Sequence, residues 1–167
     1  SAYQELQVML HDALDLCTGP AALRWAKTPA REVADHEVGH GLSARQARHG
    51  GDVCLVGVGK MLGTCLDAAD LLAANGIEAT VWDPRVVKPL DPALLDHAAT
   101  FGHVITVEDG LADGGIGASI ARELSDRCRA RPTEPRVTVL GTPTAYIAQG
   151  KADEFRAAAM NKTLIAD

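Results

Sequence analysis

The 167-residue sequence has few aromatic side chains, no block of basic residues and no long apolar run. Aromatic residues make up only 4% of the chain, so its core must consist of closely packed aliphatic side chains. The net charge of −6 argues against nucleic acid and anionic membranes as main partners. No run approaches the roughly 20 apolar residues of a membrane-spanning helix, and the first residues lack the pattern of a signal peptide. These features predict a soluble protein of the cytoplasm.

Paired cysteines are missing as well. No CxxC pair occurs among the four cysteines, which are Cys17, Cys54, Cys65 and Cys128. We therefore expect reduced thiols and neither a zinc site nor a disulfide framework, with Cys54 and Cys65 acting as small apolar side chains. His36 and His40 have the i, i+4 spacing of metal ligands on a helix, but the glycines beside them favour a loop over a metal site.

From residue 51 onward, short apolar runs alternate with amphipathic segments. The runs predict strands, and the amphipathic segments, several of which begin or end at a capping signal, predict helices. We expect strands at 53–58, 77–82, 103–107 and 137–140, and helices at 61–74, 91–100, 114–129 and 151–160. This alternation implies an α/β fold, a three-layer and mainly parallel sheet with helices on both faces.

The first 50 residues are less regular. Residues 4–16 predict a helix that ends at a Gly-Pro pair, and 21–25 form a short apolar run. Residues 28–50 are rich in charged residues, glycine and histidine without a steady period, which is typical of a connector.

The first candidate site is the turn Gly57-Val58-Gly59-Lys60 between a predicted strand and a helix. It is similar to a dinucleotide-binding fingerprint, and Asp83 ends the next strand, where a ribose-binding acid would lie. The third glycine of the fingerprint is replaced by Leu62, however. The alternative is a tight strand-to-helix turn without a ligand.

The second candidate is the segment that follows the third strand. Glu108 and Asp109 leave the carboxyl end of that strand, and a glycine cluster formed by Gly114, Gly115 and Gly117 opens a helix. Such edges of α/β sheets are where sites form, and free amides at a helix start can hold an anion. The alternative is that the glycines permit close packing and the acids cap a helix or face a neighbouring domain.

No catalytic residue is predicted. GxSxG is absent, and no serine has patterned histidine and acidic partners. Arg24 lies near the end of the apolar run 21–25, and a guanidinium is suited to bind a phosphate through two parallel hydrogen bonds.

Four motifs that follow one another in order together resemble those of a known family. VKPLD at 87–91, ITVEDG at 105–110, GGIGASIA at 114–121 and LGTP with IAQG within 140–150 follow one another at close spacing. The set resembles the C-terminal domain of the transketolase family, with 1-deoxy-D-xylulose-5-phosphate synthases as the best match. GPAALRWAK at 19–27 resembles the final strand of that family's pyrimidine-binding domain. The resemblance divides the chain into the tail of that domain (1–27), an interdomain linker (28–50) and a C-terminal domain (51–167).

The resemblance also implies a function. Such enzymes use thiamine diphosphate and Mg²⁺ to decarboxylate pyruvate and condense it with D-glyceraldehyde 3-phosphate, a step toward isoprenoids and thiamine. Cofactor and metal are held by upstream domains, so we expect neither on this segment, which is structural and inactive alone. Arg24 matches the arginine that helps bind the aldehyde's phosphate. We expect the upstream domains of the same chain as partners, a homodimer, and apolar groups in residues 1–27 that lack their neighbours. A beta subunit of a 2-oxo-acid dehydrogenase and a free-standing α/β ligand-binding module are the alternatives.

Overall fold

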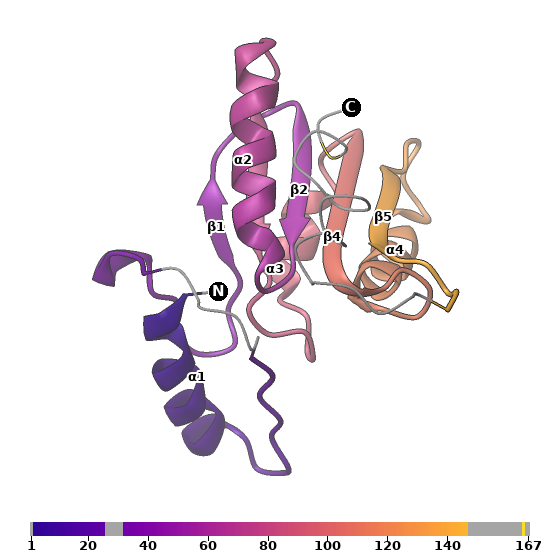
Figure 1. Ribbon diagram of the computed structural model, residues 1–167. Helices are drawn as coiled ribbons and strands as arrows, with labels where there is room; N and C mark the ends of the chain where they lie inside the picture. Colours follow the sequence, from indigo (N-terminus) through magenta and orange to yellow (C-terminus); the bar gives the residue numbers. More distant parts are fainter. Residues whose placement is uncertain (1, 26–31, 147–164, 166–167) are drawn as a thin grey trace.

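The computed structural model describes residues 2–25, 32–146 and 165. Figure 1 shows a layer of strands covered by helices, with one further helix, α1, standing apart from the strands. The helix predicted at 151–160 lies outside the described residues. Within the described residues, no helix is long and apolar enough to cross a membrane.

Five strands form one sheet in the order β1-β3-β2-β4-β5. Four of the strands are mutually parallel, and β1 runs antiparallel to β3 at one edge. Their bounds are Arg45–Arg48 for β1, Val53–Gly57 for β2, Ala79–Asp83 for β3, His103–Leu111 for β4 and Arg136–Thr142 for β5. The central strand β2 is apolar throughout, as a strand covered on both faces must be.

Helices cover both faces of the sheet. Leu55 packs with α2 (Met61–Ala74) in one core cluster, whereas its neighbours Cys54 and Val56 pack with α3 (Pro92–Ala98) and α4 (Ile116–Cys128) in the other. Successive side chains of a strand point to opposite faces, so one strand serves both clusters. The predicted three-layer, mainly parallel α/β architecture is confirmed.

The N-terminal segment contains α1 (Tyr3–Leu16), and the short 3-10 helix η1 (Asp35–Glu37) follows it. The predicted helices at 4–16 and 61–74 therefore agree with the structure to within one residue. Asp91 caps α3 as its sequence pattern predicts, because its Oδ1 accepts a hydrogen bond of 2.8 Å from the Ala93 amide.

Residues 21–25, which resemble a final strand of a preceding domain, form no strand here, and two further elements differ from the sequence prediction. The segment read as an irregular connector ends in β1, whose polar residues RQAR give no apolar signal because an edge strand is paired on one side only. β4 continues to Leu111, four residues beyond the predicted end at Val107, after a break in register with β5. Acidic residues and glycine in the extension hid it from a pattern based on apolar runs.

Candidate functional site at the carboxyl edge of the sheet

The two candidate loops lie side by side where the strand order reverses. From β2 the chain passes through α2 to β3 on one side, and β4 then takes the place on the other side of β2. Gly57 pairs with Val107, and the Val58 amide donates a hydrogen bond of 2.9 Å to the Val107 carbonyl. This is the switch point at which ligands bind in open α/β sheets.

An ion pair joins the two loops. The Nζ of Lys60, from the turn after β2, contacts the carboxylate of Asp109, from the extension of β4. Sequence reasoning treated the loops as separate candidates, and the structure brings them together through this pair.

The turn after β2 is built for close packing. A Cβ atom on Gly57 would lie 2.7 Å from the Cα of Leu62, so only glycine allows α2 to approach the strand this closely. Gly59 has a φ of +60°, in the left-handed region that glycine tolerates. These contacts agree with a tight strand-to-helix turn, which is the alternative to a nucleotide-binding fingerprint.

Asp83 does not face a ligand. Its side chain is fully buried, and its Oδ1 accepts a hydrogen bond of 3.0 Å from the Arg85 amide. A carboxylate removed from solvent in this way cannot receive the hydroxyls of an incoming ribose. The burial of Asp83 therefore favours the alternative, a tight turn without a ligand, over a ribose-binding role.

Glu108 caps α4 from within the chain. Its Oε1 accepts a hydrogen bond of 2.8 Å from the Gly117 amide, and its Oε2 accepts one of 3.1 Å from the Ile116 amide. The buried carboxylate thus occupies the positive end of the helix. The amides proposed as a free anion site already bind this anion, and the alternative that an acid caps the helix is confirmed for Glu108.

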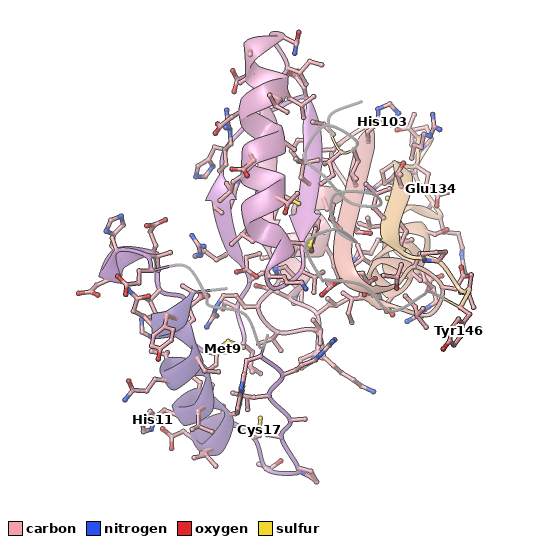
Figure 2. All side chains as sticks on the ribbon, in the orientation of Figure 1. Met9, His11, Cys17, His103, Glu134 and Tyr146 are labelled. Carbon is pink, nitrogen blue, oxygen red and sulfur yellow. The ribbon has the colours of Figure 1, made fainter. Side chains whose placement is uncertain are left out.

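We expect Glu108→Ala to destabilise the protein through the loss of this cap. Two hydrogen bonds to a charged acceptor disappear at a buried helix start, which should lower the free energy of unfolding by about 2 kcal/mol. Thermal unfolding followed by circular dichroism should show a midpoint lower by roughly 4–8 °C. The matched control is Glu134→Ala, at an exposed position before β5 on the opposite edge of the sheet (Figure 2). Equal midpoints for the two variants would contradict the capping role.

The glycine cluster holds α4 close to the loop and the strands. A Cβ on Gly115 would collide with the Leu111 carbonyl and with the Glu108 carboxylate. A Cβ on Gly117 would collide with the Thr106 hydroxyl and lie 2.7 Å from a methyl carbon of Val139. The surroundings of Gly115 and Gly117 therefore show the close packing that was the alternative for the cluster. Gly114 differs, because a Cβ there would have no atom within 4 Å and its φ of +77° is in the left-handed region.

The segment after β5 fixes the other side of the loop. The Thr142 hydroxyl donates a hydrogen bond of 2.8 Å to the Gly110 carbonyl, and the Ala112 amide donates one of 2.9 Å to the Thr142 carbonyl. The Thr144 hydroxyl donates a further bond of 2.9 Å to Asp113. The ordered motifs at 105–110, 114–121 and 140–143 therefore meet in one hydrogen-bonded loop cluster.

Arg24 lies outside this cluster, in the N-terminal segment. It is exposed, and among the described residues no hydrogen bond or ion pair ties it to the 108–117 loop. Its neighbour Trp25 lines a concavity of about 730 Å³ together with residues of α1 and the following connector. Five large apolar side chains of this segment are exposed: Tyr3, Leu10, Leu14, Leu16 and Trp25.

Sequence reasoning missed the buried ion pair between Glu5 and Arg85. The Arg85 Nε donates a hydrogen bond of 3.1 Å to the Glu5 Oε1. The Arg85 side chain is 0% exposed and the Glu5 side chain is 1% exposed. Burial by itself would raise the pKa of Glu5, but hydrogen bonds from the Ala2 and Gly39 amides and nearby positive charges, Arg85 among them, hold the pKa below its ordinary value. The two residues are 80 positions apart in the sequence, so no local pattern predicts their contact.

The buried cysteines behave as apolar side chains. Burial raises the pKa of the Cys54 and Cys65 thiols to about 12, so both stay protonated near neutral pH. In the described part of the chain, no group of three His, Cys, Asp or Glu residues is arranged to hold a metal ion.

Comparison with known proteins places these features in context. A family model described as transketolase, C-terminal domain, matches residues 42–163. The chain is 38% identical over 159 residues to a 1-deoxy-D-xylulose-5-phosphate synthase of Parafrankia sp. (strain EAN1pec), and 37% identical over 157 residues to one of Thermobifida fusca (strain YX). Each match covers 91% of this chain and 24% of the relative. The chain thus spans about a quarter of the length of these relatives.

A solved structure described as a split gene transketolase, an inactive beta4 tetramer, is also similar. It superposes with a TM-score of 0.70 and 26% sequence identity. The superposition covers 80% of this chain and 43% of that one.

Proposed function

This chain belongs to the transketolase C-terminal domain family, and we propose that it forms the C-terminal portion of a thiamine-diphosphate-dependent 1-deoxy-D-xylulose-5-phosphate synthase. Such an enzyme decarboxylates pyruvate and condenses the remaining two carbons with D-glyceraldehyde 3-phosphate. The observation that carries the proposal is the similarity over 91% of this chain to about a quarter of the length of synthases from two different bacteria.

The described residues do not suit the cofactor. A diphosphate and its magnesium ion need free amides, cations or clustered oxygen ligands. Here the amides at the start of α4 bind Glu108, and Lys60 is paired with Asp109. We therefore propose that upstream domains hold thiamine diphosphate and Mg²⁺, and we assign no step of the reaction to a cofactor on this segment.

The proposed role of the segment is structural and interdomain. The loop cluster at the carboxyl edge is fixed by its own hydrogen bonds, so it offers a preorganised surface to a neighbouring domain. Within it, Asp109 and Gly114 are exposed, and they are the positions proposed to face that domain or the active site. Upstream domains of the same chain and a homodimer are the partners that this role requires, and the chain alone is proposed to be inactive.

Arg24 is the proposed substrate contact. Its exposed guanidinium is free to grip the phosphate of D-glyceraldehyde 3-phosphate. The matching arginine in the family motif supports this assignment.

Two hybrid proteins test the proposal. In the first, this chain replaces the segment of the Thermobifida fusca synthase that it matches, about a quarter of that protein. In the second, it replaces the corresponding part of a 2-oxo-acid dehydrogenase beta subunit. We expect the first hybrid to restore its host's reaction and the second to remain inactive with its alpha partner. The reverse pattern, in hybrids that unfold cooperatively, would favour the dehydrogenase alternative.

A further inference from the structure

Arg85 follows β3 directly and binds two segments that precede the sheet in the chain. Its Nε donates a hydrogen bond of 3.1 Å to the Glu5 carboxylate on α1. Its Nη1 donates bonds of 3.1 Å to the His40 carbonyl and 2.6 Å to the Ser43 carbonyl, both in the connector before β1. A Cβ on Gly39 would collide with the guanidinium, so the connector passes the arginine at a glycine. One side chain at the end of β3 thus contacts α1 and the connector together.

The connector is hydrogen-bonded on both of its sides. On the α1 side, the Asp12 carboxylate accepts a bond of 2.6 Å from the Gly41 amide. On the sheet side, the Asp91 Oδ2, at the start of α3, accepts one of 2.7 Å from the Ala44 amide. The placement of α1 relative to the sheet therefore depends on a small set of polar contacts, in which Arg85 is the residue that binds both.

The ion pair at the centre of these contacts is buried and constrained. The Arg85 side chain is 0% exposed and the Glu5 side chain 1% exposed. A buried ion pair adds little net stability compared with apolar side chains, but the loss of one partner leaves a buried charge without compensation. The Arg85 amide donates a bond of 3.0 Å to Asp83, and its φ of 51° is rare for a residue other than glycine. The orientation of Arg85 therefore constrains where Glu5, and with it α1, can lie.

The apolar surface of α1 indicates which body the helix belongs to. Tyr3, Leu10 and Leu14 are 67%, 49% and 71% exposed, and neither core cluster of the sheet contains a side chain of α1. Under the proposed assignment of residues 1–27 to a preceding domain, the rest of that domain covers this apolar surface. Glu5 is then the buried residue through which that domain meets the C-terminal domain.

We propose that Arg85 is the residue on which the preceding domain docks, and that its buried ion pair with Glu5 fixes how the two domains meet. The proposal rests on the proposed assignment of residues 1–27 to that domain. It identifies an interdomain contact at the end of β3, separate from the 108–117 loop. Arg85 is a positioning residue in this role and contacts no substrate.

Amide hydrogen exchange of the synthase hybrid, followed by mass spectrometry, tests the docking role. In Glu5→Gln and in Arg85→Met, connector peptides within residues 33–44 should exchange at least about tenfold faster, while peptides of β2, of β4 and of the host's upstream domains keep their protection. Arg85→Lys should exchange at an intermediate rate, because lysine keeps the charge but cannot bind the carboxylate and the carbonyls in the same fork geometry.

The matched control is Arg48→Met on β1, which breaks an exposed ion pair of 2.5 Å with Asp70. It should leave connector exchange unchanged. Unchanged connector exchange in Glu5→Gln would overturn the proposal. Equal acceleration of the connector, β2 and β4 in Glu5→Gln would overturn it as well, because the pair would then belong to the fold of the C-terminal domain itself.

Two features keep the test independent of other failures. Glu5→Gln alters a side chain outside the C-terminal domain, so the test stands even where Arg85→Met fails to fold. The same exchange measurement applies to the dehydrogenase hybrid. A synthase hybrid that forms no product therefore contradicts the proposed function, whereas unchanged connector exchange contradicts only the docking role of Arg85.

Discussion

Gly117→Ala should lower the free energy of unfolding by about 3 kcal/mol, the upper part of the range for overpacking in a close-packed interior. The new methyl group would meet the Thr106 hydroxyl and a Val139 methyl, both on strands that cannot move independently. It would also lie 3.3 Å from the Glu108 carboxylate and thereby disturb the cap of α4. Thermal unfolding should show a midpoint lower by roughly 6–12 °C.

Two further variants isolate the cause. Gly102→Ala is the matched control, because a Cβ there has no atom within 4 Å. Thr106→Ala removes the colliding hydroxyl, which is buried without a hydrogen-bond partner among the described residues, so the double variant should regain part of the lost stability. Equal stability of Gly117→Ala and Gly102→Ala would refute the close-packing account of the glycine cluster.

Arg24→Ala should raise the KM for D-glyceraldehyde 3-phosphate by about 10- to 150-fold, measured in the hybrid with the Thermobifida fusca synthase. Loss of a charge-assisted contact to phosphate costs about 1.5–3 kcal/mol, and each 1.4 kcal/mol corresponds to a factor of ten. The KM for pyruvate should stay constant, because pyruvate carries no phosphate. Arg24→Lys should give an intermediate value, since lysine keeps the charge but not the two-pronged geometry.

The control is Arg122→Ala on α4, another exposed arginine, whose ion pairs with Glu123 and Asp126 lie on the same helix. It should leave both KM values unchanged. An increase in the pyruvate KM of Arg24→Ala, or no increase in either KM, would remove Arg24 from the phosphate site.

Local patterns predicted the central βαβ unit because its residues satisfy several requirements at once. The run at 53–58 is apolar as a doubly covered strand must be, and 61–74 combines an apolar face with an Asn-Gly stop. The same reasoning missed β1. This short, polar edge strand is defined by its pairing with β3 and not by its own composition.

The site was less predictable than the fold because its key contacts are distant in sequence. The pattern placed Glu108 at a strand end near a glycine-rich helix start, but only the folded chain shows the carboxylate bound to the helix amides. Asp83 matched a ribose-binding position by spacing, but its burial favours a tight turn without a ligand. Glu5 and Arg85 meet across 80 residues, a separation at which periodicity and spacing carry no signal.

The most direct measurement of the central claim is the product formed from pyruvate and D-glyceraldehyde 3-phosphate by the synthase hybrid, supplied with thiamine diphosphate and Mg²⁺. We predict that mass spectrometry detects 1-deoxy-D-xylulose 5-phosphate with the hybrid and none with this chain alone. A hybrid that unfolds cooperatively, has the oligomeric state of its host and forms no 1-deoxy-D-xylulose 5-phosphate would contradict the account.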